Sequence, residues 1–200
     1  MENDPGIDSE MYGRMLIALE EIENCREFSP LIPEVRTNMV YARPGARVPA
    51  DVLAIDGRIT VVSGMPRAAG RPRFGVSSHM ARLVLSIMEV HPGIRTAIDF
   101  SNTPDLARWL PGYCQRNDWA FAVIDRIAEP TGSREVEGST MTWKAREAIR
   151  LAGTQPPKVF CDAGAFGKEP VSVIVGADPI STARDLCGIA RQYARDRRKR

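Results

Sequence analysis

The sequence predicts an α/β protein with a mixed β-sheet and helices on both faces of the sheet. Apolar, strand-like runs alternate along the chain with segments of helical periodicity. Two of these runs, 158–162 and 171–175, are joined only by a glycine-containing loop, and strands joined so directly pair antiparallel. A chain of 200 residues, 44% hydrophobic and 26% charged, is sufficient for one domain with a substantial core.

The N-terminal segment predicts an amphipathic helix that runs to about Glu27. Asp8 or Ser9 serves as its N-cap, and one side carries Met11, Met15, Leu19 and Ile22. The prolines between 30 and 33 then predict an extended, rigid link. Residues 1–30 are therefore expected to form a leader and helix, and residues 31–200 the main domain. A helix of this kind must pack on the domain or on a second copy of the chain, so we expect a homodimer.

The remaining elements follow from apolar runs, capping residues and turn residues. Strands are predicted at 38–42, 58–62, 94–100, 119–127, 158–162 and 171–175. Helices are predicted at 103–113, 139–151 and 180–197, and the first of these opens with a threonine cap followed by proline. Residues 49–53 suggest a helical turn, and 64–70 a turn-rich loop.

The strongest helical pattern follows Ser77 and Ser78, either of which suits the N-cap. Apolar residues recur at i, i+3, i+4, i+7 and i+8, namely Met80, Leu83, Val84, Ile87 and Met88. His79 and Arg82 fall off this stripe, and Pro92-Gly93 ends the helix. Because a helix N-terminus presents unpaired N–H groups and positive dipole, it suits a phosphate or carboxylate. An ordinary amphipathic helix with a polar first turn is the alternative.

Composition excludes several classes of protein. The four cysteines are far apart without a C-x-x-C pair, which argues against structural zinc and against a disulfide framework. No apolar run approaches a membrane span and no signal peptide is evident, so we expect a cytoplasmic protein without a membrane partner. A net charge of +2 is too small to indicate nucleic acid, and the basic run at 195–200 complements a helix end.

The loop containing Gly164, Gly167 and Lys168 resembles a P-loop only superficially. A Walker A loop requires G-x-x-x-x-G-K-[ST] before a helix, whereas here Glu169-Pro170 and a strand follow. Exposed backbone N–H groups and a lysine still suit a phosphate, although Gly-Lys turns between strands are common. Arginines at turn segments, among them Arg43, provide guanidinium groups that match phosphate oxygens.

Five segments together resemble the ThiN domain, the archaeal-type thiamine-phosphate synthase. They are 38–42 (NMVYA), 55–59 (IDGRI), 74–82 (FGVSSHMAR), 137–143 (EGSTMTW) and 167–170 (GKEP), in the same order as in the family. The resemblance covers roughly residues 31–185. It implies a three-layer α/β/α sandwich with a mixed sheet, related to class II aldolases. Family members are often fused to a hydroxymethylpyrimidine phosphate kinase or to a DNA-binding domain, and this chain looks like a stand-alone form.

The resemblance implies that hydroxymethylpyrimidine diphosphate and a thiazole phosphate combine to give thiamine phosphate and pyrophosphate, with Mg²⁺ as the expected cofactor. An arginine and a histidine carried by the enzyme members map to Arg58 and His79, with Arg71 or Arg73 as alternatives to Arg58. The residues expected to bind substrate or phosphate are Asn38, Tyr41, Arg43, Ser77, Ser78, Arg82, Gly164, Gly167, Lys168 and Glu169; the metal ligands are left unassigned. The segment from Asp99 to Asn102 departs from the family pattern.

Two other functions compete with this interpretation. A non-catalytic ThiN module would bind thiamine phosphate as a regulatory effector, but the presence of Arg58 and His79 favours the enzyme. An aldolase-like lyase would need clustered histidine ligands, and the chain has only His79 and His91.

Overall fold

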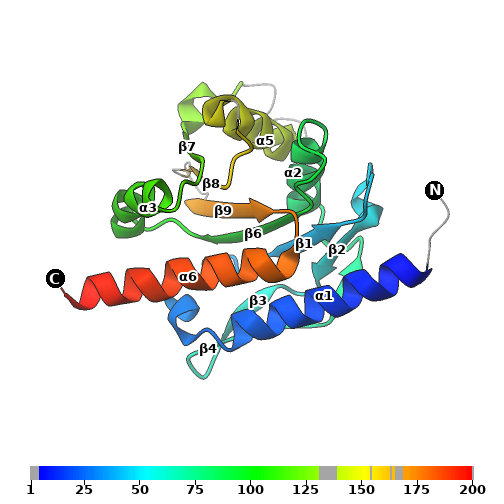
Figure 1. Cartoon of the computed structure of the whole chain (residues 1–200), viewed down its shortest axis with the longest axis horizontal. Coiled ribbons are helices and arrows are strands. Elements are labelled where there is room, and N and C mark those ends of the chain that lie inside the picture. The colour runs from blue at the N-terminus through cyan, green and yellow to red at the C-terminus, as the bar shows by residue number, and fades with distance from the viewer. Residues whose placement is uncertain (1–4, 131–138, 154, 163, 165–168, 200) are drawn as a thin grey trace.

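The structure, a computed structural model, describes residues 5–130, 139–153, 155–162, 164 and 169–199. Its centre is a seven-stranded sheet in the order β5-β2-β1-β6-β9-β8-β7 (Figure 1). The strands are β1 (Met39–Ala42), β2 (Val52–Ile55), β5 (Pro72–Phe74), β6 (Thr96–Ser101), β7 (Phe121–Ile124), β8 (Val159–Asp162) and β9 (Val171–Gly176). Only β7 and β8 pair parallel among these seven; β8 and β9 pair antiparallel, so the predicted mixed sheet is confirmed.

Helices cover both faces of this sheet. α1 (Pro5–Glu23), α3 (Pro104–Arg116) and α6 (Pro179–Arg198) pack into one apolar core, and α2 (His79–Met88) and α5 (Ser139–Ala152) into the other (Figure 1). Alternate residues of each strand supply the two cores: Met39 and Tyr41 of β1 face the first, Val40 and Ala42 the second. No helix in the described ranges is both long and apolar enough to cross a membrane.

The N-terminal helix differs from the prediction in its limits. α1 begins at Pro5, so Asp8 lies within it and pairs with Arg43 instead of capping. The prolines do not produce an extended link, because a 3₁₀-helix, η1 (Arg26–Leu31), continues the helical path. Met15 and Ile22 are completely buried in the core shared with the sheet. α1 therefore packs into the same apolar core as one face of the sheet.

Two further predictions are wrong, one in a second, smaller sheet and one beside β2 of the main sheet. Residues 64–70 contain β4 (Met65–Ala68), which pairs antiparallel with β3 (Ile59–Val62). The helical turn at 49–53 is confined to the 3₁₀-helix η2 (Pro49–Asp51), and β2 follows at once. β4 has little strand signal of its own and pairs with β3, whereas Val52–Ile55 is apolar throughout and pairs with β1 and β5. The strand predicted at 119–127 is also shorter, because η3 (Arg126–Ala128) follows β7.

Candidate functional site

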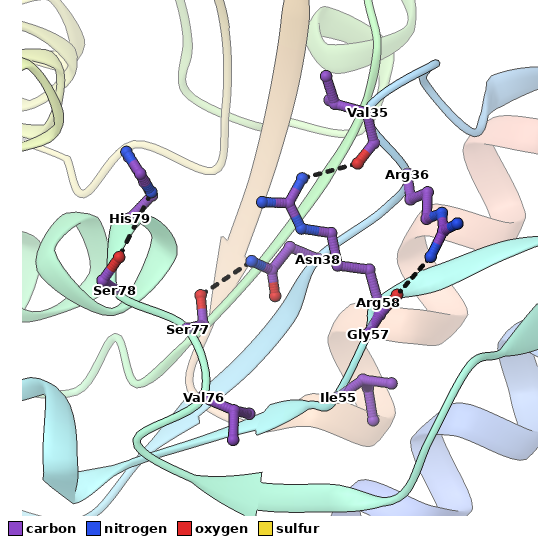
Figure 2. A pocket seen from close by; sticks show the side chains of 10 residues that line it. All are labelled: Val35, Arg36, Asn38, Ile55, Gly57, Arg58, Val76, Ser77, Ser78 and His79. Carbon is purple, nitrogen blue, oxygen red and sulfur yellow. Dashed lines mark hydrogen bonds between the residues drawn. The ribbon is translucent and has the colours of Figure 1, made fainter.

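A polar pocket of about 430 Å³ opens beside the N-terminus of α2. Three segments that are distant in the sequence form it: the chain before β1, the β2–β3 turn and the residues leading into α2 (Figure 2). The residues that line it are Val35, Arg36, Asn38, Ile55, Gly57, Arg58, Val76, Ser77, Ser78 and His79. We call this pocket the outer compartment.

The backbone of the β2–β3 turn places Arg58 in the outer compartment. Gly57 and Arg58 have φ values of +70° and +68°, and a non-glycine residue with positive φ is uncommon. A Cβ on Gly57 would also lie 2.9 Å from the Cβ of Ala69, so the turn has little room for another residue. Arg58 Nη1 donates to the carbonyl oxygen of Val35 at 2.6 Å (Figure 2), which orients the guanidinium between the two segments.

The residues at the start of α2 are polar, as predicted, but the predicted serine side-chain cap does not form. Ser78 occupies the N-cap position, yet its side chain makes no capping hydrogen bond. Its Oγ lies 3.4 Å from Nδ1 of His79, while Oγ of Ser77 accepts a hydrogen bond from Asn38 Nδ2 at 2.8 Å (Figure 2). Without a side-chain cap, the N–H groups of the first turn are available to an anion.

A second, more apolar pocket of about 280 Å³ adjoins the outer compartment; we call it the inner compartment. Val35, Asn38, Arg58 and His79 line both, so these four residues form the boundary between them. The inner compartment is further lined by Met80, Leu83, Asp99, Met141, Lys144, Phe160, Asp162, Glu169, Val171 and Val173. Most of these belong to β6, β8, β9, α2 and α5, so the sheet forms its floor.

Asp99 is a buried carboxyl on this floor. Its Oδ1 accepts the backbone N–H of Asn38 at 2.8 Å, and its own N–H donates to the carbonyl oxygen of Asn38 at 3.1 Å. Burial raises the pKa of Asp99 to about 7; the hydrogen bond from Asn38 and the charge of Arg58 oppose this shift. Burial therefore favours the protonated form of this carboxyl.

A buried cluster of ionic side chains completes the inner compartment. Asp162 pairs with Lys144 and, at 3.1 Å, with Arg126, which also pairs with Glu129 at 2.9 Å. Burial lowers the pKa of Lys144, and the neighbouring Asp162 opposes that shift. The cluster connects α5 to β8 and to η3, so it holds the wall of the compartment. Removing one partner would leave a buried charge without its counter-charge.

The structure brings together about half of the predicted site residues. Those that line a compartment are Asn38, Arg58, Ser77, Ser78, His79 and Glu169. Both carboxylate oxygens of Glu169 are already in use, since they accept the N–H groups of Glu34 at 3.0 Å and Val35 at 3.2 Å. Gly167 and Lys168 lie outside the described residues.

Four predicted residues line neither compartment. Tyr41 faces the opposite core, with the Arg95 guanidinium 4.6 Å from its ring centre, because successive side chains of β1 alternate between faces. Arg43 binds Asp8 and covers the Phe74 ring. The remaining two also lie elsewhere: Arg82 of α2 lines neither pocket, and Gly164 donates its N–H to Asp162.

The alternative arginines are also displaced from the site. Arg73 is largely exposed and pairs with Asp56 at 3.0 Å, and Arg71 lines neither compartment. In the described part of the chain, no three His, Cys, Asp or Glu side chains form a group that could hold a metal ion.

Sequence reasoning missed Arg36, Asp99, Lys144 and Asp162. Asp99 had a detectable signal, because a carboxylate in the middle of an apolar strand must be paired, protonated or functional. Arg36 had none, since its position depends on the path of the chain before β1.

Comparison of the sequence with known proteins identifies related thiamine biosynthesis proteins. The family model described as thiamine-phosphate synthase ThiN matches residues 14–187. The chain is 38% identical over 176 residues to thiamine-phosphate synthase ThiN of Methanothermobacter thermautotrophicus, covering 88% of this chain and 90% of the relative. It is 30% identical over 164 residues to the bifunctional thiamine biosynthesis protein ThiDN of Methanocaldococcus jannaschii, covering 82% of this chain but only 37% of that larger protein.

A solved structure, the C-terminal domain of phosphomethylpyrimidine kinase, superposes with a TM-score of 0.86 at 30% identity, covering 91% of this chain and 99% of that domain. By its sequence and by its fold, this chain belongs to the thiamine-phosphate synthase ThiN family.

Proposed function

We propose that this protein is a thiamine-phosphate synthase, which joins hydroxymethylpyrimidine diphosphate to a thiazole phosphate and releases pyrophosphate. One observation of the site carries the proposal: a polar, cationic compartment and an apolar compartment meet at Arg58 and His79. The reaction needs this division, because each substrate combines a flat ring with a strongly anionic group. Membership of the ThiN family supplies the activity.

The outer compartment is suited to the diphosphate. Arg36 and Arg58 contribute two guanidinium groups, and the uncapped first turn of α2 contributes N–H groups and positive dipole. His79 stands at the same helix terminus, with the Ser78 hydroxyl beside its ring. The charge of the leaving pyrophosphate grows as the C–O bond breaks. Preorganised donors at this position therefore stabilise the transition state more than the ground state.

The inner compartment is suited to a ring. Met80, Leu83, Met141 and Phe160 provide apolar walls, and the buried Lys144–Asp162 pair supports one side. When the C–O bond breaks, its electron pair leaves with pyrophosphate and positive charge spreads over the pyrimidine. The thiazole nitrogen then forms the new C–N bond. Holding the two rings in line at the boundary between the compartments lowers the entropic part of the barrier.

The described residues do not fit a resident Mg²⁺ site. Of the nearby carboxylates, Glu169 uses both oxygens on backbone N–H groups, and Asp162 is shared by Lys144 and Arg126. Mg²⁺ in proteins often retains waters and binds substrate phosphates with few side-chain ligands. We therefore propose that Mg²⁺ enters as part of the diphosphate substrate complex.

The same proposal extends to the fold relationship and the assembly. Apolar cores on both faces of the sheet support a three-layer α/β/α arrangement of the class II aldolase type. Leu16 and Ile17 of α1 are 41% and 48% exposed, which supports a homodimer to which α1 contributes. Biosynthesis from phosphorylated precursors supports a cytoplasmic location.

The decisive experiment incubates the purified protein with both substrates and Mg²⁺ and measures thiamine phosphate and pyrophosphate. We expect the two products in equal amounts and dependent on both substrates. Binding of thiamine phosphate without any synthesis would instead support a regulatory module. Pyrophosphate release that does not need the thiazole would indicate hydrolysis.

A further inference from the structure

We propose that Asp99, with the side-chain oxygen of Asn38, recognises the aminopyrimidine ring in the inner compartment and selects it against rings that lack the amine. This inference rests on the proposed function, because it assigns one of the two substrates to one of the two compartments. It gives Asp99 the role of a specificity-determining residue.

The two side chains are neighbours on adjacent strands. Asn38 immediately precedes β1 and Asp99 lies in β6. The backbone N–H of Asp99 donates to the carbonyl oxygen of Asn38, and the backbone N–H of Asn38 donates to the Asp99 carboxyl. Both side chains line the inner compartment. Asn38 is 4% exposed, and within the described residues its Oδ1 accepts no hydrogen bond. An unused acceptor this deeply buried costs free energy unless a ligand donates to it.

The carboxyl of Asp99 is also only partly used. Oδ1 accepts the Asn38 N–H, whereas no donor in the described part of the chain reaches Oδ2. Three charged groups act on it from other elements: Arg58 and Lys144 lower its pKa and Glu169 raises it, and burial outweighs all of them. With a pKa of about 7, the carboxyl can donate or accept a hydrogen bond near neutral pH.

This pattern of donors and acceptors matches the pyrimidine and not the thiazole. The aminopyrimidine offers two N–H donors on its amine and acceptors on its ring nitrogens. Asn38 Oδ1 and the Asp99 carboxyl can accept from the amine, and the protonated carboxyl can donate to a ring nitrogen. The thiazole has a ring nitrogen but no N–H donor, so in this place it would leave the buried acceptors unpaired.

The placement also agrees with the chemistry of the proposed reaction. With the ring on the floor formed by β6, the diphosphate projects past Arg58 and His79 into the outer compartment, since those residues line both spaces. As the C–O bond breaks and positive charge reaches the amine, a hydrogen bond from that amine to a carboxylate becomes stronger. Asp99 therefore stabilises the cation more than the neutral substrate.

The test compares two ligands on four proteins. The ligands are hydroxymethylpyrimidine monophosphate, which lacks the diphosphate leaving group, and its analogue with hydrogen in place of the amine. The proteins are the wild type, Asp99→Ala, Asp99→Asn and Thr96→Val. Thr96 is the matched control, because it is buried on the same strand, β6. Its hydroxyl donates to the Val40 carbonyl of β1 at 2.7 Å, yet it lines neither compartment. Calorimetry gives the dissociation constants.

We expect the wild type and Thr96→Val to bind the amine-bearing ligand about 30-fold more tightly, the scale of a hydrogen bond to a charged group. Asp99→Ala should reduce this preference to within about threefold, mainly by weakening the binding of the amine-bearing ligand. Asp99→Asn, which preserves size should the alanine variant fail to fold, should also reduce it. Its amide oxygen is needed by the Asn38 N–H, and the remaining NH₂ cannot accept from the amine.

Retention of the full amine preference in a folded Asp99 variant would overturn the inference. Equal binding of the two ligands by the wild type would overturn it as well. The synthesis assay distinguishes failure of this inference from failure of the proposed function. A wild type that makes thiamine phosphate while its Asp99 variants remain selective refutes only the assignment of the ring. A wild type that neither binds the pyrimidine phosphate nor makes product refutes both.

Discussion

The buried carboxyl of Asp99 makes a quantitative prediction about how stability depends on pH. Its pKa is about 7 in the folded protein, against an ordinary value of 3.8. Between these two values the folded state binds the proton and the unfolded state does not. The free energy of unfolding therefore falls as pH rises through this range. The contribution is fully present below about pH 4 and is lost as pH rises through 7.

The magnitude follows from the shift. A difference of 3.2 between 7 and 3.8, at about 1.36 kcal/mol for each pKa unit, corresponds to about 4 kcal/mol over the full range. Between about pH 5 and pH 8, the part accessible to a folded protein, linkage gives a loss of about 2–3 kcal/mol. Asp99→Asn removes the titration while leaving an oxygen to accept the Asn38 N–H. The stability of the variant relative to wild type should rise by this amount over that range.

Urea unfolding of both proteins, followed by far-ultraviolet circular dichroism across that pH range, measures the difference. The pKa values of Asp8 and Asp178 are lowered: Arg43 acts on Asp8, and the Ser181 N–H and Arg14 act on Asp178. Their contributions to the free energy of unfolding are therefore lost only at lower pH, and equally in both proteins. Thr96→Val, on the same buried strand, removes no titratable group; it is the control and should show no pH-dependent difference. A stability difference between Asp99→Asn and wild type that stays constant with pH would refute the reasoning.

Three further predictions concern the site and the core. His79→Ala should lower kcat about a hundredfold or more with an unchanged unfolding midpoint, because the side chain is exposed at a helix terminus; equal turnover by variant and wild type would remove His79 from the catalytic groups. Arg58→Ala should cause a similar loss in steady-state kinetics, whereas Arg73→Ala, an exposed residue outside both compartments, should change activity little; the opposite pattern would show that Arg73 is the catalytic arginine. Met15→Ala should cost about 2–5 kcal/mol in chemical denaturation, because the side chain is completely buried between α1 and the core; a cost near zero would show that α1 does not belong to the cooperative unit.

Much of the architecture was accessible from sequence because its signals are local. The apolar stripe of α2, the cap-and-proline start of α3 and the short β8–β9 connection each depend on a few consecutive residues. The elements that were missed depend on partners. β4 contains a proline and an arginine and has little strand propensity of its own, but each of its four residues pairs with a residue of β3.

The site residues also divide into those with a local sequence signal and those placed by strand pairing. The segment from Ser77 to His79 stands out because polar and charged residues precede a clear helix, and Arg58 follows a glycine in a turn. Arg43 and Tyr41 looked equally suitable. Which face of β1 meets the pocket is decided by register and by the alternation of side chains, and a single-residue shift reverses it.

The sequence by itself determined the class of fold, most helices, the helix terminus that carries His79 and, through family resemblance, the activity now supported by comparison. Only the tertiary structure decided that Asn38 and Asp99, 61 positions apart, close against each other, and that polar and apolar compartments adjoin at Arg58. The reason is physical: local propensities depend on neighbours along the chain, whereas a binding site is formed by strand pairing and burial, which join residues without regard to their separation in sequence.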